Sequence, residues 1–473
     1  MRDDIRLYRS FEAGFSYQPT QLQNELLKKL ADFVINGSSR SLFLLKGYAG
    51  TGKTTIVSTV VNHIGEVGVK SVLMAPTGRA AKVMGAYAKR PAFTIHKKIY
   101  YPKKDPGGRM SFVIQQNKHQ NTLFIVDEAS MIPDSNPDAR LFHNRSLLFD
   151  LMSYVYSGKH CKLILVGDTA QLPPVKLNLS PALDGDFLAL EFDKQVISME
   201  LNEVMRQHET SGILVNATLI RSFLSQGLLN TFKFDLQHPD VSRLTDGYDI
   251  QDAIFDTYNQ GLDKTVFIVR SNKRANLYNQ QIRNNILGYD NEITSGDFIM
   301  VVKNNYFWLK DAPKVGFIAN GDTCEVLEIF NFKELYGFRF AEVKLRLVDY
   351  DEQAPFETVL LLDTLHSEAP SLSYEEMNRL YHTVAEDYAE EKSKHKRQLA
   401  IKNNKYFNAL QVKFSYALTC HKTQGGQWDN VFVEQPYLPE GEDIPYLRWL
   451  YTAITRAQKK LFLIGFKDDY FQD

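Results

Sequence analysis

The stretch that most constrains the fold of this chain is Gly47–Thr55, with the sequence GYAGTGKTT. An apolar run, Leu42–Leu45, precedes it, and a stretch compatible with a helix, Thr55–Ile64, follows it. This strand–loop–helix order is the context in which G-x-x-x-x-G-K-[ST] binds phosphate. The glycines let the backbone turn tightly and aim N–H groups at an anion, and the helix adds its positive N-terminal end. The sequence therefore predicts a nucleotide site, and a plain glycine turn is the weaker interpretation.

Individual residues of this region predict how a nucleotide is held. Lys53 is placed to bridge the outer phosphates, and the Thr54 hydroxyl is placed to hold Mg²⁺. Gln21, shortly before the loop, carries an amide that can pair with an adenine edge, although a solvent-facing glutamine at a helix start explains it as well. The predicted nucleotide contacts are Gln21, Gly47, Gly50, Gly52, Lys53, Thr54, Thr55 and Asp127.

Polar residues follow three further apolar strands of the first half of the chain. Thr122–Val126 ends in Asp127 and Glu128, which suit Mg²⁺ binding and activation of water, respectively, in ATP hydrolysis. Lys162–Val166 ends in a loop with Gln171, which is placed to sense the terminal phosphate. Ser71–Met74 ends in APTGRAA. Because parallel strands present ligands at their C-terminal ends, these stretches predict a parallel sheet covered by helices.

Composition limits the classes of protein that fit. The 473 residues exceed one ordinary core and predict two to four domains. A net charge of −1 gives no overall positive field, so a nucleic acid would need a local basic groove. Three scattered cysteines and no signal-type or membrane-spanning apolar run favour a soluble cytoplasmic protein without a membrane partner.

Two insertions interrupt the α/β pattern. Thr94–Gln120 predicts a β-hairpin that carries lysines and aromatic side chains, which suit contact with nucleic acid or an ordinary solvated surface. Strands at Phe298–Val302, Thr323–Ile329 and Ala341–Val348 predict a small antiparallel barrel. After it, Tyr374–Leu399 predicts one charged helix, either a protruding arm or a solvated helix.

The second half predicts another parallel sheet without its own phosphate loop. Its strands are expected at Val266–Val269, Phe414–Leu418, Val431–Val433 and Leu461–Ile464. Arg206 lies near the end of LNEVMRQ, after which the pattern changes, and Arg456 in YTAITRA lies on a stretch compatible with a helix. An arginine that crosses a cleft to a transferring phosphate is an arginine finger, whereas a surface ion pair is the plainer interpretation of Arg456.

The order of these motifs resembles that of superfamily 1 DNA helicases, in particular the 5′-to-3′ RecD/Dda-like branch. The resemblance covers about Gln18 to Arg456, and eight motifs in order are far more specific than any one alone. They are GYAGTGKTT, APTGRAA, TIH, DEAS, GDTAQLPP, LNEVMRQ, LTCHKTQGGQW and YTAITRA.

This resemblance implies an ATP-dependent DNA helicase that moves 5′ to 3′ on single-stranded DNA, unwinds duplex DNA and uses Mg²⁺-ATP between two motor domains. It implies single-stranded DNA and single/double-strand junctions as partners, a monomeric motor, and replication or repair proteins as further partners. The implied catalytic residues are Lys53, Glu128, Gln171, Arg206 and Arg456. The implied DNA contacts are Pro76, Thr77, Thr94, His96, Thr419, His421 and Thr423.

The implied architecture is α/β, with two RecA-like parallel-sheet motor domains, a β-hairpin insertion in the first and an SH3-like β-barrel insertion in the second. Tyr100, Tyr101 and Phe112 remain equal candidates for the tip that splits a duplex. The expected divisions are 1–95 with 121–205 (first motor), 96–120 (hairpin wedge), 206–299 with 412–473 (second motor) and 300–411 (barrel with charged arm).

Other functions remain open at this point. One is a single-stranded DNA translocase that displaces bound proteins with little unwinding. A nucleotide-dependent switch that binds DNA without cycling has no need of Lys53, Glu128, Arg206 and Arg456 together. A small-molecule kinase has no need of a second sheet, and it would turn over ATP without nucleic acid.

Overall fold

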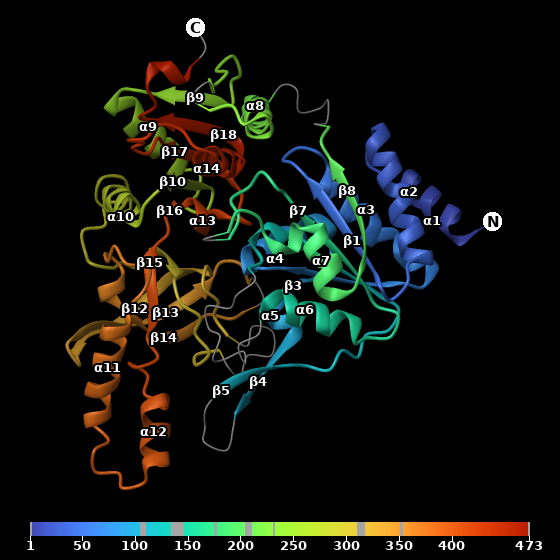
Figure 1. Cartoon of the computed structure of the whole chain (residues 1–473). Coiled ribbons are helices and arrows are strands. Elements are labelled where there is room, and N and C mark those ends of the chain that lie inside the picture. The colour runs from blue at the N-terminus through green and yellow to red at the C-terminus, as the bar shows by residue number, and fades with distance from the viewer. Residues whose placement is uncertain are drawn as a thin grey trace.

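The structure is a computed structural model that describes residues 2–104, 110–133, 146–174, 177–203, 211–229, 232–309, 317–350 and 353–471. Figure 1 shows one parallel sheet with its helices on the right, a second above left, and a barrel with a helical arm below left. Among the helices of the described ranges, none is long and apolar enough to cross a lipid bilayer.

The first sheet has six strands, all paired in parallel. In spatial order they are β3 (Ala92–Thr94), β2 (Lys70–Ala75), β6 (Thr122–Val126), β7 (Lys162–Gly167), β1 (Ser41–Gly47) and β8 (Gln195–Leu201). Four of them were predicted, and β3 and β8 were not. The phosphate loop follows β1, which lies between β7 and β8. Of the other predicted polar strand ends, that of β7 is on the adjacent strand and that of β6 is one strand further away.

Both faces of this sheet are covered. Phe43 and Leu45 of β1 belong to one core, and Leu42 and Leu44 belong to the other, because successive strand side chains point to opposite faces. The first core packs under α1 (Asp3–Gly14), α2 (Gln21–Asn36), α3 (Lys53–His63) and α4 (Gly78–Ala88). The second packs under α5 (Ile95–Ile99), α6 (Leu147–Tyr156) and α7 (Gly185–Phe192).

The second sheet has five parallel strands. They are β16 (Ala417–Thr419), β10 (Thr265–Val269), β17 (Trp428–Glu434), β18 (Ala457–Ile464) and β9 (Val241–Leu244). One face packs against α8 (Gly212–Gln226) and α14 (Ile444–Ile454), and the other against α9 (Gly247–Tyr258) and α10 (Asn272–Gln281). Two sheets of this type agree with two RecA-like domains.

A closed barrel of five strands is present where a small antiparallel barrel was predicted, and its strands extend beyond 300–411. The prediction that it is antiparallel is wrong for one pair, since its last two strands run parallel to each other. Its strands are β11 (Phe298–Val301), β12 (Thr323–Leu335), β13 (Phe338–Leu347), β14 (Phe356–Leu361) and β15 (Leu410–Phe414). The predicted strand Phe414–Leu418 is wrong as one element, since β15 closes the barrel against β11 and β16 joins the second sheet. The barrel core and one face of that sheet form one continuous cluster.

The predicted helix Tyr374–Leu399 is also wrong as one element. The structure has α11 (Tyr374–Glu386) and α12 (Lys394–Asn403), and the Ser393 side chain accepts a hydrogen bond from the Lys396 amide to start the second helix. Leu380, Val384 and Ile401 of this pair pack on the outside of the barrel. In Figure 1 the two helices form an arm below the barrel.

The predicted hairpin is confirmed in β4 (Tyr100–Lys104) and β5 (Met110–Ile114), which pair antiparallel from Tyr100↔Ile114 to Lys104↔Met110. Its tip, with Arg109, lies outside the described residues. Phe112 is 6% exposed, and its ring centroid lies 4.5 Å from that of Tyr306 and 6.2 Å from that of Phe317, both between β11 and β12. The barrel region therefore braces the base of the hairpin.

Candidate nucleotide-binding cleft between the two sheets

The phosphate loop has the backbone that its glycines predict. Gly50 and Gly52 have φ values of 75° and 87°, in the left-handed region that favours glycine. Gly52 is also the residue before α3, and a Cβ there would lie 2.6 Å from Nε2 of Gln23. A glycine at position 52 is thus required both by conformation and by the close approach of α2.

Within the described residues, polar groups from nearby hold this loop. Lys53 Nζ donates to the Tyr48 carbonyl at 2.7 Å, and Gln23 Nε2 donates to the Thr51 carbonyl at 3.1 Å. Thr54 is exposed in the first turn of α3, and Gly47 and Thr55 flank the loop. Gln21 is exposed at the first position of α2, so the glutamine that the structure brings to the loop is Gln23, which the sequence analysis missed.

The two carboxylates after β6 have different environments. Asp127 Oδ2 accepts from the Tyr87 hydroxyl at 2.6 Å, and its Oδ1 accepts from the Glu128 amide at 2.8 Å. Glu128 has a φ of 54°, uncommon for a residue with a side chain. Burial raises the pKa of the Glu128 carboxyl, Asp127 adds to the rise, and Arg456 opposes it. Carboxylate and hydroxyl oxygens suit Mg²⁺, so Asp127 and Thr54 fit the metal that the sequence predicts.

Arg456 reaches this site from the second sheet. Its side chain is 4% exposed and its Nη1 lies 3.9 Å from Glu128 Oε1. Nε donates to the Thr452 carbonyl at 3.1 Å, and Nη1 donates to the Gly426 carbonyl at 3.3 Å. These bonds from its own lobe fix the guanidinium at the junction of the two sheets. Arg206, the other predicted finger, lies outside the described residues.

Gln171 also lies in this buried seam. It is 7% exposed, and among the described residues its carboxamide oxygen has no hydrogen-bond partner. The next residue, Leu172, donates its amide to Thr452 Oγ1 at 2.8 Å, and its carbonyl accepts from Gln424 Nε2 at 2.6 Å. The GDTAQLPP loop of the first sheet is therefore held by residues of the second.

The predicted DNA contacts from the first sheet lie at helix starts. The Thr77 and Thr94 hydroxyls cap α4 and α5 by accepting from the amides of Ala80 and Lys97. Pro76 is partly exposed beside Thr77. Burial lowers the pKa of His96 to about 4, so this imidazole is neutral at ordinary pH.

The predicted DNA contacts from the second sheet differ in exposure. Thr419 is half-buried and His421 is exposed, but Thr423 has 0% exposure and donates to the Cys420 carbonyl. The structure thus brings Thr423 to the interior rather than to a surface. Gly425 links the two sets of residues, since a Cβ there would lie 3.2 Å from Thr77 Oγ1 and 2.7 Å from Ala80 Cβ.

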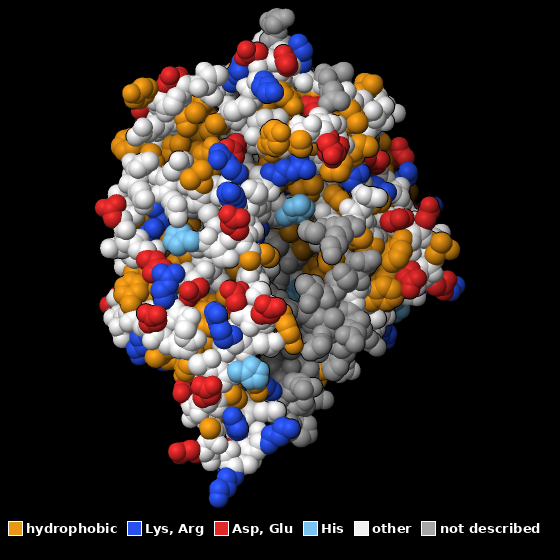
Figure 2. Space-filling view, turned by 60° about the vertical axis from the view of Figure 1, so that its left-hand side comes forward, with side chains coloured by type: hydrophobic (Ala, Val, Ile, Leu, Met, Phe, Trp, Pro, Cys, Tyr) orange, Lys and Arg blue, Asp and Glu red, His pale blue; other side chains and the backbone are white. Residues whose placement is uncertain are grey.

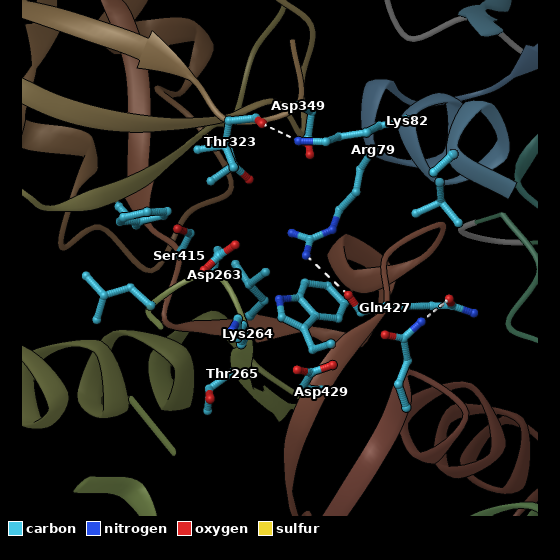
Figure 3. Close-up of a pocket in the computed structure, with 18 residues that line it drawn as sticks. Arg79, Lys82, Asp263, Lys264, Thr265, Thr323, Asp349, Ser415, Gln427 and Asp429 are labelled. Atoms are coloured by element: carbon cyan, nitrogen blue, oxygen red, sulfur yellow. Dashed lines mark hydrogen bonds between the residues drawn. The ribbon is translucent and has the colours of Figure 1, made fainter. Parts of the chain in front are cut away.

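A cavity of about 350 Å³ lies where α4, the barrel and the second sheet meet. Figure 3 shows Arg79 aimed from α4 toward the second sheet and Lys82 toward the barrel. The Arg79 guanidinium lies 3.8 Å from the centroid of the Trp428 ring and donates to the Gln427 carbonyl at 3.4 Å, while Lys82 Nζ donates to the Val348 carbonyl at 2.7 Å. Helix α4 therefore contacts both neighbours.

Surface charge agrees with the near-zero net charge. In the described part of the face drawn in Figure 2, basic and acidic side chains are intermixed. Together, two parallel sheets that meet at a phosphate loop, a partly buried carboxylate and an arginine from the opposite lobe form a two-lobed cleft whose residues fit a nucleotide.

Comparisons with known proteins show which proteins this chain is similar to. The model of the AAA domain matches residues 21–222, and that of the UvrD-like helicase C-terminal domain matches residues 414–464. The ATP-dependent RecD2 DNA helicase of Deinococcus radiodurans is 29% identical over 41% of this chain and 24% of its own. The ATP-dependent DNA helicase dda of Enterobacteria phage T4 is 23% identical over 89% of this chain and 93% of its own. These matches show that the chain is similar to superfamily 1 helicases of the RecD/Dda type.

A solved structure, the Pif1 helicase from Bacteroides in complex with ADP-AlF3 and ssDNA, is 15% identical with a TM-score of 0.46, and the match covers 96% of this chain and 95% of that one. The chain spans less than half the length of two curated relatives that it matches, at 39% and 24% of their lengths.

Proposed function

We propose that the protein is an ATP-dependent DNA helicase that translocates 5′ to 3′ on single-stranded DNA and unwinds duplex DNA. The observation that carries the proposal is the approach of Arg456, from the second sheet, to 3.9 Å from Glu128, which follows a strand of the first sheet. A hydrolytic site assembled from two lobes opens and closes with its nucleotide, which is the requirement for a motor.

Each residue around the phosphate loop has a part in this scheme. Lys53 exchanges its bond to the Tyr48 carbonyl for the outer phosphates, and the loop amides hold the remaining phosphate oxygens. Glu128, with its raised pKa, orients the attacking water and takes its proton. Arg456 stabilises the charge that develops on the transferring phosphoryl group.

Mg²⁺, held by Thr54 and Asp127, would neutralise phosphate charge when bound. Gln171, buried in the seam beside residues bonded to the second lobe, is placed to pass the state of the terminal phosphate to that lobe. Arg206 completes the proposed catalytic set as the second finger. Gln21 remains the proposed adenine contact, with Gln23 supporting the loop behind it.

Single-stranded DNA is proposed to cross both lobes at the APTGRAA and HKTQGG loops. The close approach of Gly425 to Thr77 supports this path, because a strand lying there contacts both lobes at once. Pro76, Thr94, His96, Thr419 and His421 are the other proposed contacts. Polarity follows from the RecD/Dda-type relationship.

Strand separation is assigned to the hairpin. Tyr100 and Phe112 are each 6% exposed and face inward, and the Tyr100 hydroxyl donates to Asp150 Oδ2 at 2.8 Å. Tyr101 is 41% exposed, so of the three aromatic candidates it is the one available for stacking on a base. The barrel region, through Tyr306 and Phe317, holds the hairpin against the force of an advancing duplex.

An unwinding assay on duplexes with a single-stranded tail at either end tests the proposal. We expect ATP-dependent separation only of substrates with a 5′ tail, and ATP hydrolysis stimulated by single-stranded DNA. Unwinding from a 3′ tail would overturn the polarity. Removal of a bound protein block without unwinding would identify a translocase, and hydrolysis without any response to DNA would overturn the proposed function.

A further inference from the structure

One hydroxyl group joins the two lobes at the phosphate loop. Tyr451 on α14 is 1% exposed, and its hydroxyl accepts a hydrogen bond from the Ala49 amide at 2.9 Å and donates one to Asp168 Oδ2 at 2.7 Å. Ala49 is in the phosphate loop after β1, and Asp168 is in the GDTAQLPP loop after β7. A residue of the second lobe thus bridges two loops of the first.

The bridge is buried and its hydroxyl keeps its proton. Asp168 is 2% exposed, and its Oδ1 accepts from the Ala170 amide at 2.9 Å, so the two bonds together satisfy both carboxylate oxygens. Burial, and then Asp168, raise the pKa of Tyr451 well above its ordinary value. A buried carboxylate that loses a donor is strongly disfavoured, so the bond from Tyr451 holds the Asp168 loop in place.

Two further hydrogen bonds join the GDTAQLPP loop to the second lobe. The residue after Tyr451, Thr452, accepts the Leu172 amide at 2.8 Å, and Gln424 donates to the Leu172 carbonyl at 2.6 Å. The GDTAQLPP loop is therefore bonded to the second lobe at both Asp168 and Leu172. When the second lobe moves away, this loop and the phosphate loop lose a shared partner at the same moment.

We propose that Tyr451 is a positioning residue, whose hydroxyl fixes the phosphate loop to the Asp168 loop and makes both follow the second lobe. It does not touch the reacting atoms. It sets the conformation of Ala49 and its neighbours before nucleotide binds, so nucleotide affinity depends on the position of the second lobe. The inference rests on the proposed function only because that function supplies the ligand, a nucleotide. The contacts of Tyr451 do not depend on it.

The test compares Tyr451→Phe with Tyr446→Phe in the full chain. Tyr446 lies on the same helix, is 0% exposed, and donates its hydroxyl at 2.7 Å to Gln435, within the second lobe. Hydrogen exchange of the peptide containing Ala49 is measured without nucleotide, and affinity is measured with ADP. For Tyr451→Phe we expect exchange about 10-fold faster and ADP binding about 10-fold weaker, and for Tyr446→Phe neither change.

A second variant keeps the test decisive if Tyr451→Phe folds poorly. Asp168→Asn retains the acceptor for the Ala170 amide but replaces the oxygen that accepts from Tyr451, so exchange at Ala49 is again expected to rise. The double variant is expected to exchange no faster than Tyr451→Phe alone, because the two residues share one bridge.

Equal exchange and ADP affinity in the two tyrosine variants would overturn the inference, as would additive effects in the double variant. Neither measurement uses DNA or hydrolysis. If Tyr451→Phe shows the expected changes in exchange and ADP affinity but the wild type has no DNA-stimulated ATPase activity, the proposed function is refuted and the inference stands.

Discussion

Arg456 and Glu128 face each other across the seam between the two sheets, with Arg456 Nη1 3.9 Å from Glu128 Oε1. The guanidinium is almost completely buried and takes its position from the Thr452 and Gly426 carbonyls. In the proposed mechanism, a cation held by its own lobe beside the carboxylate of the other lobe needs little reorganisation when the lobes close.

Arg456→Ala should therefore lower the catalytic rate far more than nucleotide affinity. We expect kcat for DNA-stimulated ATP hydrolysis to fall by about 10³-fold or more, the range for an arginine finger. Steady-state ATPase and ADP titration measure the two quantities. Lys459→Ala is the control, since Lys459 is a cation three residues further along the chain, on β18, but its side chain is 69% exposed and pairs with Asp429. An unchanged kcat would make Arg456 a structural residue.

Lys53→Ala should abolish ATP turnover and leave the fold intact. Within the described residues, Lys53 donates only to the Tyr48 carbonyl, a partly buried loop contact, so its loss costs little stability. Its charge is needed only once phosphates arrive. ATPase activity tests the expected loss of turnover, and the midpoint of urea unfolding, measured on the same preparation, tests whether the fold stays intact. Retained DNA-stimulated hydrolysis would show that the nucleotide binds elsewhere.

The residues that sequence reasoning found are those whose signal is local. The limits of the strand Thr122–Val126 were predicted correctly, because two carboxylates directly after an apolar run mark the end of the strand clearly. The strand β8 was missed since Gln195, Ser198 and Glu200 interrupt its apolar pattern. The three-residue strand β3 is too short for any periodicity.

The residues that were missed act through contacts between distant segments. Tyr451 meets Ala49, Tyr87 meets Asp127, and Gln23 meets Thr51, and none of these pairs shares a local motif. Family order placed Arg456 near the nucleotide, but only the packing of α14 shows that Thr452 and Gly426 hold it. Reasoning from one sequence therefore predicts where strands end, but it does not predict the contacts between the two lobes.

Asp322 should make stability fall as pH rises. It is 2% exposed, and burial raises its pKa from 3.8 to about 7, partly offset by the Ala319 amide. Between these values the folded state keeps a proton that the unfolded chain has released. The stabilisation is complete below the unfolded pKa and is lost as pH rises through about 7.

The corresponding variant is Asp322→Asn, which keeps an oxygen for the Ala319 amide and cannot ionise. Relative to it, the wild type should lose on the order of 2–3 kcal/mol between about pH 5 and about pH 8. Urea unfolding of both proteins at the two pH values gives the difference, and the comparison cancels other groups such as His96. Parallel pH profiles of the two proteins would contradict the expectation.

Phe112→Ala should uncouple unwinding from hydrolysis. The substitution removes the ring that packs 4.5 Å from Tyr306, so the hairpin loses its brace on the barrel region. We expect unwinding to fall by about 10-fold or more, while DNA-stimulated ATPase stays near the wild-type rate because the cleft is untouched. Strand displacement and ATPase assays on one preparation test this.

Two further variants serve as comparisons for Phe112→Ala. Phe149→Ala truncates an aromatic ring on α6 that packs on Phe192 of α7 rather than on the barrel region, and should spare unwinding. Tyr101→Ala removes the exposed aromatic of the hairpin and should reduce unwinding without the loss of stability that a buried ring causes. Full unwinding by Phe112→Ala would show that the hairpin needs no support from the barrel.

Arg79 should link the DNA-contacting loop to the catalytic arginine. It follows Thr77 and Gly78 in APTGRAA, and its guanidinium lies 3.8 Å from the centroid of the Trp428 ring. Gly426 packs against both side chains, since a Cβ there would lie 2.5 Å from Trp428 Cη2 and 2.9 Å from Arg79 Nε. The Gly426 carbonyl accepts from Arg456, so the chain of contacts runs from the proposed DNA-contacting loop to the proposed nucleotide site.

Arg79→Ala should therefore lower the stimulation of ATPase by single-stranded DNA about 5- to 30-fold and leave the basal rate largely unchanged, since a stacked cation of this kind is worth about 1–2 kcal/mol. Arg79→Lys keeps the charge but not the planar stack on Trp428. The stimulation of its ATPase by DNA should therefore lie between that of the wild type and that of Arg79→Ala. Lys82→Ala, which removes the bond from the same helix to the barrel, controls for a general loosening of α4. The decisive quantity is the ratio of rates with and without DNA, and a ratio unchanged in Arg79→Ala would mean that the two sites communicate by another route.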